Sequence, residues 1–270
     1  MIKIGVMQGR LSPIYNNKIQ KFPTLHWKSE FFIARSLNLN LIEWTIDLEN
    51  FYKNPIITTK GIIEIKKLIE ITGINLKSIT ADCFMHELIW IKNNKNILKK
   101  LIRIIESCGK LKIRYIIFPL VDDSSIKNKQ TEDKLVKILK KFKKILKKND
   151  VSILFEIDYG PKKVKKFISK FDKENFGINY DSGNSASAGY DINEEFGNYG
   201  KYIKNIHIKD RIKKGKTVKL GTGSTNFKKL FANIKKMNYK NNLILQTARS
   251  CTGEHIAEII DNLNFMKKYQ

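Results

Sequence analysis

The feature that most constrains the fold of this chain is a regular alternation of short apolar segments with longer amphipathic ones. Eight apolar runs are each followed by a segment in which apolar residues recur at helical spacing. Near-continuous apolar strands that alternate with amphipathic helices are typical of a parallel sheet covered by helices. Eight such units in 270 residues predict an α/β fold, the (β/α)8 or TIM barrel, as a single domain over residues 1–270.

The expected elements follow one another along the whole chain. The strands are predicted at residues 2–7, 40–46, 76–81, 113–119, 151–157, 176–181, 203–208 and 242–246. The helices are predicted at about 27–37, 59–72, 94–111, 130–148, 161–170, 193–201, 226–237 and 253–267. In the helix at 130–148, Leu135, Leu139, Phe142 and Leu146 share one face and lysines occupy the other, which is typical of a helix that covers a sheet.

A doubly wound open sheet is the main alternative to a barrel. Many members of that fold carry a Gly-rich, phosphate-binding turn after the first strand. The segment from Gly5 to Arg10, Gly-Val-Met-Gln-Gly-Arg, lacks the required glycine spacing. The barrel is therefore the preferred prediction.

The formal net charge of +25 raises the question of a polyanionic partner. Only six of the 51 basic residues are arginines, whereas nucleic-acid readers usually also use arginine forks and aromatic side chains. We therefore interpret the lysines as solvated helix faces and expect no nucleic-acid partner. Such a basic field would still attract an anionic substrate.

The sequence also predicts the cellular compartment of the protein. It contains no apolar stretch of about 18 residues that would span a membrane, and its first segment is too short and too quickly polar for a signal peptide. The three cysteines, Cys83, Cys108 and Cys251, fit no metal or disulfide spacing. We expect reduced thiols in a cytoplasmic protein.

The candidate site residues come from the strand ends, because the loops after the strands form the catalytic face of a β/α barrel. This rule selects polar and aromatic side chains at all eight ends. They are Gln8, Arg10, Glu43, Trp44, Asp82, His86, Asp122, Asp123, Glu156, Asp158, Asp181, Asn184, His207, Asp210, Arg211, Gln246 and Arg249.

Four of these residues form the strongest constellation. Glu156, Asp181, His207 and Gln246 end four separate strands and offer two carboxylates, an imidazole and an amide carbonyl. Taken singly, each is interpreted as a hydrogen-bonded strand-end group. Taken together, they predict a divalent-metal site, because buried carboxylates are costly unless they are paired with a cation. Mixed oxygen and nitrogen ligands suit Mn, Co, Mg or Zn, with one position open for substrate.

Several motifs extend this interpretation. They are Gly5-Val6-Met7-Gln8-Gly9-Arg10-Leu11-Ser12, Ile42-Glu43-Trp44, Asp181-Ser182-Gly183-Asn184-Ser185, His207-Ile208-Lys209-Asp210-Arg211, and Leu220-Gly221-Thr222-Gly223 followed by Asn226-Phe227. With these motifs the sequence resembles, over nearly its whole length, the xylose-isomerase-like family of TIM barrels, the sugar phosphate isomerase/epimerase group. The resemblance implies an isomerase or epimerase of carbohydrate metabolism with a sugar or sugar-phosphate substrate. Because barrels of this family often dimerise, a homodimer is one expectation.

The resemblance also implies how the metal is held. In the family, Glu, Asp, His and Glu from strands five to eight bind a divalent ion, and these positions correspond here to Glu156, Asp181, His207 and Gln246. The first three fit, whereas Gln246 departs from the pattern. In the ketose epimerases, the first and last carboxylates also act as the two bases on opposite faces of the substrate.

Gln246 can give a metal its carbonyl oxygen, but its amide cannot usefully accept a proton near neutral pH. Two reactions therefore stay open. Glu156 can act as a single base that moves a proton between C1 and C2 through a metal-stabilised enediolate, which is aldose–ketose isomerisation. Alternatively, Glu43, Asp82 or His86 serves as the second base of an epimerase.

The remaining strand-end residues are expected to bind substrate. Arg10, Arg211 and Arg249 suit a phosphate or carboxylate, although salt bridges to Asp210 or Asp158 explain them equally well. The other expected substrate-binding residues are Glu43, Asp82, Asn184 and Asp210. The loops at 12–26 and 83–93 are long enough to act as lids.

Two other functions stay open. A metal phosphodiesterase resembling the apurinic endonucleases that share this barrel fits the basic charge. Such enzymes, however, use a cluster of several histidines for three zinc ions, and this chain has only four histidines, of which His26 and His255 lie at predicted helix starts. A non-catalytic sugar-binding barrel is the third hypothesis, which Gln246 favours.

Overall fold

The structure of the protein is a computed structural model that describes residues 2–14, 20–92, 94–249 and 253–269. The strands are β1 (Lys3–Met7), β2 (Leu41–Thr45), β3 (Asn75–Thr80), β4 (Tyr115–Leu120), β5 (Ser152–Ile157), β6 (Phe176–Asp181), β7 (Ile203–Ile208), β8 (Asp210–Arg211), β9 (Thr217–Val218) and β10 (Asn242–Leu245). The α-helices are α1 (Trp27–Ser36), α2 (Thr59–Thr72), α3 (Cys83–His86), α4 (Lys95–Leu111), α5 (Lys129–Lys140), α6 (Lys143–Asn149), α7 (Pro161–Ile168), α8 (Ser182–Ala188), α9 (Ile192–Tyr199), α10 (Phe227–Lys236) and α11 (His255–Lys267). Short 3-10 helices occur at Phe51–Lys53, Pro55–Ile57, Asp122–Ser124 and Gly200–Tyr202.

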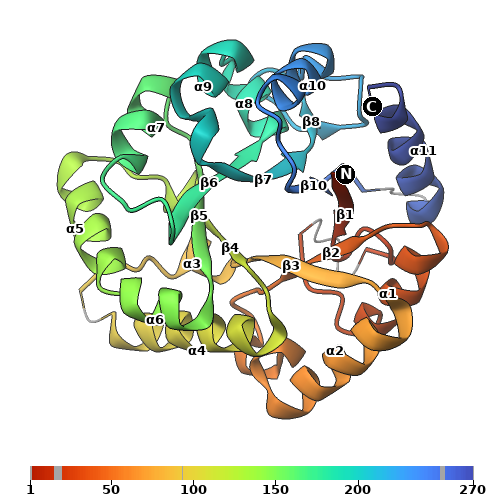
Figure 1. The fold of residues 1–270 in the computed structure, drawn as a ribbon, viewed down its shortest axis with the longest axis horizontal. Coiled ribbons are helices and arrows are strands. Elements are labelled where there is room, and N and C mark those ends of the chain that lie inside the picture. Colours follow the sequence, from red (N-terminus) through yellow and green to blue (C-terminus); the bar gives the residue numbers. More distant parts are fainter. Residues whose placement is uncertain (1, 15–19, 93, 250–252, 270) are drawn as a thin grey trace.

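Eight of the strands form a closed barrel in the order β1-β10-β7-β6-β5-β4-β3-β2, and the helices surround it (Figure 1). Every neighbouring pair is parallel. β1 pairs with β10 on one side and with β2 on the other, so the first and last strands close the barrel. Each predicted strand overlaps one of these eight, and the predicted (β/α)8 fold is confirmed.

The helices begin and end at residues that satisfy free backbone groups. The side chain of Thr58 accepts a hydrogen bond from the backbone N–H of Gly61 at the start of α2, and Gly73 ends that helix with a φ of 71°. Asn128 and Asn226 cap α5 and α10 in the same way. Such caps satisfy N–H groups that have no partner within the helix.

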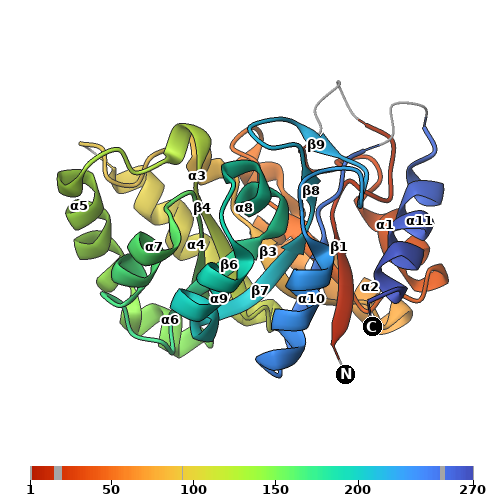
Figure 2. The ribbon, with the colours of Figure 1, turned by 90° about the horizontal axis from the view of Figure 1, so that it is seen from above.

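Two regions differ from the predicted pattern. The single helix predicted at 130–148 is two helices, α5 and α6, which are separated at Lys141 and Phe142. Phe142 stays buried within the break, so the apolar face that produced the helical pattern continues across it. The second region surrounds β7, where α8 precedes the predicted helix at 193–201 and the antiparallel hairpin β8–β9 follows the strand. Figure 2 shows this hairpin at the end of the barrel opposite the start of β1.

The outer faces of the strands pack on the helices through large apolar side chains. The ring centroid of Phe155 in β5 lies 5.1 Å from that of Phe167 in α7 and 5.1 Å from that of Phe171. Burying one such side chain stabilises the fold by about 1.5–3 kcal/mol. Because successive side chains of a strand point to opposite faces, the neighbouring Glu156 points to the inside of the barrel.

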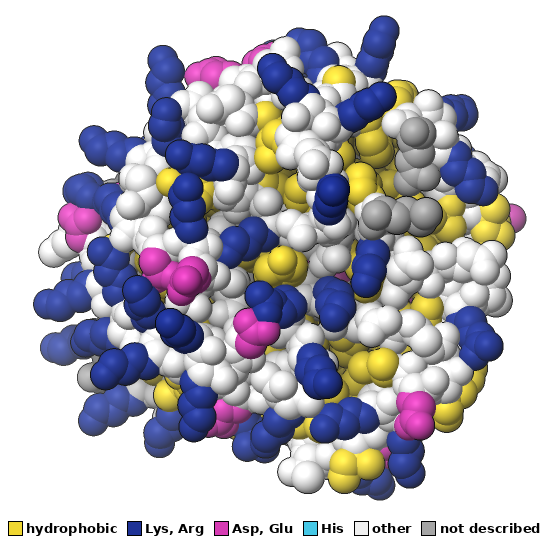
Figure 3. Space-filling model, in the orientation of Figure 1, with side chains coloured by type: hydrophobic (Ala, Val, Ile, Leu, Met, Phe, Trp, Pro, Cys, Tyr) yellow, Lys and Arg dark blue, Asp and Glu magenta, His cyan; other side chains and the backbone are white. Residues whose placement is uncertain are grey.

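The surface carries the basic charge without concentrating it. Lys and Arg side chains are spread around the outline and across the face seen in Figure 3. None of the helices in the described ranges is long and apolar enough to cross a membrane. Cys83 and Cys108 are buried free cysteines, and Cys251 lies outside the described residues.

Candidate active site

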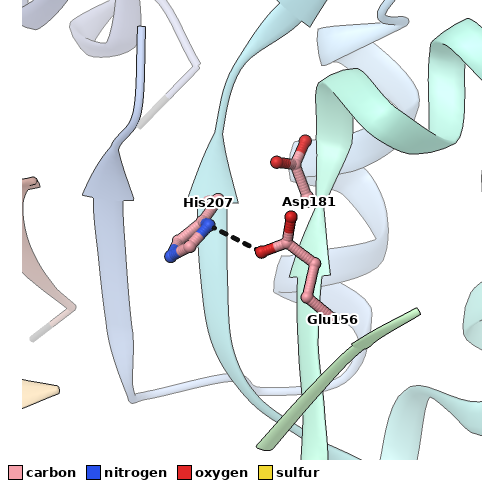
Figure 4. Close-up of side chains that lie close together, drawn as sticks. All are labelled: Glu156, Asp181 and His207. Atoms are coloured by element: carbon pink, nitrogen blue, oxygen red, sulfur yellow. Dashed lines mark ion pairs between the residues drawn. The ribbon is translucent and has the colours of Figure 1, made fainter. Parts of the chain in front are cut away.

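Three of the four predicted metal ligands lie together on the inner wall of the barrel. Glu156, Asp181 and His207 come from the neighbouring strands β5, β6 and β7, and Asp181 is in register with His207. Each is buried and offers one ligand atom, and these atoms lie within 4.8 Å of one another. Figure 4 shows Glu156 and His207 facing each other, with the Asp181 carboxylate beside them.

His207 is fully buried between two carboxylates. Its Nε2 lies 2.7 Å from Oε1 of Glu43, and its Nδ1 lies 3.2 Å from Oε2 of Glu156. Burial alone would lower the pKa of His207, but the charges of Glu43 and Glu156 outweigh burial and raise the pKa to about 10. A cation is therefore favoured between Nδ1 of His207 and the carboxylates of Glu156 and Asp181. This cation can be a proton or a metal ion.

Glu43, a predicted substrate-binding residue, lies beneath His207 in the barrel interior. Its Oε1 accepts a hydrogen bond from the hydroxyl of Thr80 and contacts Nε2 of His207. Its Oε2 accepts hydrogen bonds from the hydroxyl of Ser78 and the amide of Asn205. Burial raises the pKa of Glu43, but His207 and the hydroxyl donors outweigh burial and lower it. With four partners and no exposed surface, its carboxylate is enclosed by protein groups.

A lysine outside the predicted set reaches the remaining side of the cluster. Nζ of Lys209 lies 3.3 Å from Oδ2 of Asp181 and 3.3 Å from Oε1 of Gln246, the fourth predicted ligand. Gln246 is buried just after β10. Lys209 follows His207 by two residues, and side chains two apart on a strand share a face. This spacing is the signal for Lys209 in the sequence, and it is weak in a chain with 51 basic residues.

Glu156 is oriented by two amides. Nδ2 of Asn179 donates to its Oε2 at 2.8 Å, and Nδ2 of Asn184 donates to its Oε1 at 2.9 Å. Oδ1 of Asn184 accepts in turn from Arg211 at 2.8 Å. Glu156, Asp181 and Asn184 line a small cavity of about 60 Å³. The structure thus brings the predicted residues Asn184 and Arg211 to the cluster.

Arg10 and Asp82 follow β1 and β3, across the barrel from the cluster, and are joined by Gln20. Arg10 donates to Oε1 of Gln20 at 3.0 Å, and Nε2 of Gln20 donates to Asp82 at 3.0 Å. Burial raises the pKa of Asp82 to about 7. Burial and the nearby Arg249 lower the pKa of Arg10 to about 10. A carboxyl group that titrates near neutral pH can both donate and accept a proton.

His86 lines the surface cavity of about 600 Å³ that Gln20 and Asp82 also line. Its side chain is 61% exposed, and its Nδ1 lies 3.5 Å from Asp123. Of the three predicted second bases, Glu43 is enclosed and His86 is open to solvent. Asp82 is half-buried and lies on the cavity wall.

Asp210, predicted to bind substrate, instead organises a loop. Its carboxylate accepts hydrogen bonds from the backbone N–H groups of Gly221, Gly223 and Thr225, and it has no exposed surface. A Cβ at Gly223 would lie 2.3 Å from Oδ1 of Asp210, so the motif Leu220-Gly221-Thr222-Gly223 exists because this loop wraps closely around the carboxylate. The three backbone hydrogen bonds thus fix the loop after β9 on the Asp210 carboxylate.

Arg249 is half-buried, and one of its guanidinium nitrogens donates to the backbone carbonyl of Ser12 at 2.7 Å. This contact places Arg249 against the loop after β1. The predicted lid at 12–26 is described except for residues 15–19, and the predicted lid at 83–93 begins with α3 and is described except for residue 93.

Glu30 of α1 also holds the loop after β1, and this contact predicts that the stability of the protein depends on pH. The Glu30 carboxylate accepts from the backbone N–H groups of Gly9 and Leu11 and from the Ser12 hydroxyl. Burial raises the pKa of Glu30 to about 7 from an ordinary 4.5. The folded protein therefore binds this proton more tightly than the unfolded chain, and the associated stability is complete below about pH 4.5 and is lost as pH rises through about 7.

Glu30→Gln should remove this pH dependence, because all three donors lie within reach of one oxygen that glutamine retains. The free energy of unfolding of the wild type, relative to the variant, is expected to fall by about 3 kcal/mol from pH 4.5 to pH 8. Urea unfolding at several pH values measures it. A difference that does not vary with pH would contradict the assignment.

The donors of the cluster fit a divalent ion. Two carboxylates, one imidazole nitrogen and one amide oxygen suit Mn, Co, Mg or Zn. Nε2 of His207 is occupied by Glu43, which fixes the ring and directs Nδ1 toward Glu156 and Asp181. Such an outer carboxylate is a usual support for a metal-binding histidine.

The comparisons with known proteins agree with the barrel fold. Three similar solved structures are a xylose isomerase domain protein from Planctomyces limnophilus (13% identity, TM-score 0.78, 99% of this chain and 97% of that one), an IOLI protein with a bound zinc atom (15%, 0.77, 100% and 99%) and the 3-keto-D-glucoside 4-epimerase YcjR from E. coli (16%, 0.75, 99% and 100%). A sequence comparison with curated proteins finds no match. At these identities the structures show a common fold.

The family is shown by a second comparison. The family model of the xylose isomerase-like TIM barrels matches residues 31–269, which is most of the chain. The matched range includes β2 to β10 and all four predicted metal ligands. The chain therefore belongs to the xylose isomerase-like TIM barrel family.

Proposed function

We propose that the protein is a divalent-metal-dependent isomerase or epimerase that acts on a sugar or sugar phosphate. The observation that carries the proposal is the buried cluster of Glu156, Asp181 and His207, whose ligand atoms lie within 4.8 Å of one another. The cluster sits at the carboxyl ends of adjacent strands, where barrels of this kind hold their active sites. The family, and the sugar epimerases among the similar structures, support the same reaction class.

The metal would be held by Glu156, Asp181 and His207, with the amide oxygen of Gln246 as a fourth ligand. When bound, the ion supplies Lewis acidity that polarises a substrate carbonyl and the hydroxyl beside it. Because His207 is held by Glu43 and Asp181 caps α8 through the N–H of Asn184 at 2.8 Å, these ligands are fixed before substrate arrives.

Glu156 is the proposed base. The amides of Asn179 and Asn184 fix its carboxylate, which would remove a proton from the carbon that bears the hydroxyl and deliver it to the neighbouring carbon. Isomerisation needs only this one group. Epimerisation needs a second group on the opposite face, and Asp82 is the best placed candidate because it is half-buried on a cavity wall and its pKa is raised to about 7.

The cations around the cluster suit an anionic substrate. Arg211 reaches Asn184, and Lys209 reaches Asp181 and Gln246. Arg10 and Arg249 lie at the loop after β1. We therefore propose that a phosphate or carboxylate of the substrate is bound by this basic side of the site. The phosphodiesterase alternative is less well supported, because the metal-ligand cluster found among the described residues contains one histidine.

The proposal is tested by proton exchange at carbon. The protein would be loaded in turn with Mn²⁺, Co²⁺, Mg²⁺ or Zn²⁺ and incubated in D₂O with a panel of ketoses and ketose phosphates. Mass spectrometry after chelation of the metal then detects deuterium bound to carbon. Incorporation by the wild type that requires the metal supports the proposal. No incorporation with any metal and any member of the panel would favour the non-catalytic sugar-binding barrel.

A further inference from the structure

Lys209 is held in place by its backbone and its stem. Its backbone carbonyl accepts hydrogen bonds from the hydroxyls of Ser182 (2.7 Å) and Thr225 (3.1 Å), and its N–H donates to Ser182 at 2.9 Å. A Cβ at Gly183 would lie 2.6 Å from Cγ of Lys209, so this glycine leaves the space through which the stem passes. The direction of the side chain is therefore fixed by the first residues of α8.

The ammonium group ends between two of the proposed metal ligands. Nζ lies 3.3 Å from both Oδ2 of Asp181 and Oε1 of Gln246, and the side chain is 15% exposed. The oxygens that a divalent ion would use are the oxygens that Lys209 contacts. A carboxylate oxygen bound to a cation attracts a second cation less strongly, and two cations this close repel each other in a partly buried site.

We infer that Lys209 competes with the divalent ion for Asp181 and Gln246, and so lowers the metal affinity of the site. This inference rests on the proposed metal-dependent function. Metal binding displaces the ammonium from both oxygens, and the ion is held mainly by Glu156 and His207 until Lys209 has moved. The site thus binds its metal more weakly than its four ligands alone would allow.

Lys209→Met tests this inference, because methionine keeps an unbranched stem of similar length over Gly183 and removes the charge. Metal affinity is measured without substrate, by competition between the protein and a fluorescent chelator for Mn²⁺ and for Zn²⁺ at fixed pH and ionic strength. The variant is expected to bind each ion at least tenfold more tightly than the wild type. Circular dichroism confirms that the proteins compared are folded.

Two control variants show whether the change in metal affinity depends on the charge itself and on its position at residue 209. Lys209→Arg keeps a cation in place and should stay within about threefold of the wild-type affinity. Lys213→Met removes an exposed charge from the turn between β8 and β9 and should also stay within about threefold of the wild-type affinity. If Lys209→Met destabilises the fold, Lys209→Gln is measured in its place with the same expectation.

The possible failures are distinguishable. If the wild type binds metal and the uncharged variants bind it no more tightly, the inference is overturned while the proposed function stands. If none of the proteins binds metal, both are overturned. If only the uncharged variants bind metal, the inference is supported and the metal-dependent function of the wild type is contradicted.

Discussion

Glu156→Gln should reduce the rate of deuterium incorporation from D₂O by about 10²–10⁴-fold with any substrate that the wild type turns over. The amide keeps the size of the side chain and an oxygen for the metal, but it cannot accept a proton at neutral pH. The variant is therefore expected to lose exchange activity even when its metal site is saturated. Single-turnover exchange at several metal concentrations measures this.

A matched control is available two residues further on. Asp158→Asn removes a carboxylate that lies outside the metal cluster, where Asp158 accepts a hydrogen bond from Ser125 at 2.6 Å. That variant should retain the exchange activity to within about tenfold. If Glu156→Gln remains as active as Asp158→Asn, another residue is the base, and Asp82→Asn becomes the variant to measure.

The second large effect is on stability. Glu43→Ala should lower the free energy of unfolding by about 3–5 kcal/mol, because it removes one of the two carboxylates that flank the buried His207. It also leaves the hydroxyls of Ser78 and Thr80 without the carboxylate acceptor and removes one of the two acceptors of Asn205, which adds to the cost. Urea denaturation at pH 7 measures the change.

Glu64→Ala provides the comparison for Glu43→Ala. Glu64 forms an ion pair with Lys28 at 3.0 Å on the outer helices, and an ion pair with this much solvent contact contributes about 0–1 kcal/mol. The two variants should therefore differ by several-fold in their effect. A cost for Glu43→Ala as small as that of Glu64→Ala would contradict the view that Glu43 supports His207.

The architecture was predictable because a parallel barrel imposes a strong pattern. Strands covered on both sides must be apolar nearly throughout, and the helices between them must be apolar on one side only. The break between α5 and α6 was not predictable from that pattern, because Phe142 keeps the apolar spacing intact across it. The hairpin β8–β9 has strands of two residues, which are too short for a periodic signal.

The meeting of the three proposed metal ligands was predictable for a related reason. Adjacent parallel strands end side by side, so Glu156, Asp181 and His207 had to meet once the fold was a barrel. Which carboxylates face a ligand and which face the protein depends on register and loop path. Glu43 contacts His207, a contact without a signature in the sequence. Asp210 accepts hydrogen bonds from the loop after β9, and only Gly223, which leaves room for its carboxylate, marks that contact in the sequence.

Lys209 was hidden by composition. Among 51 basic residues a single lysine after a strand carries little information, and solvated lysines are the norm in this chain. Its position two residues after His207 gains meaning only when Gly183 and Asp181 are seen beside it.

The most direct test of the metal site is the metal content of the wild type and of His207→Ala. Both proteins would be loaded with Mn²⁺, Co²⁺, Zn²⁺ or Mg²⁺, passed through a desalting column, and analysed for bound metal with circular dichroism as the check on folding. The account predicts near-stoichiometric metal in the wild type for at least one of these ions and its loss in the variant. No metal in the wild type after loading, or an equal amount in both proteins, would contradict the proposed site.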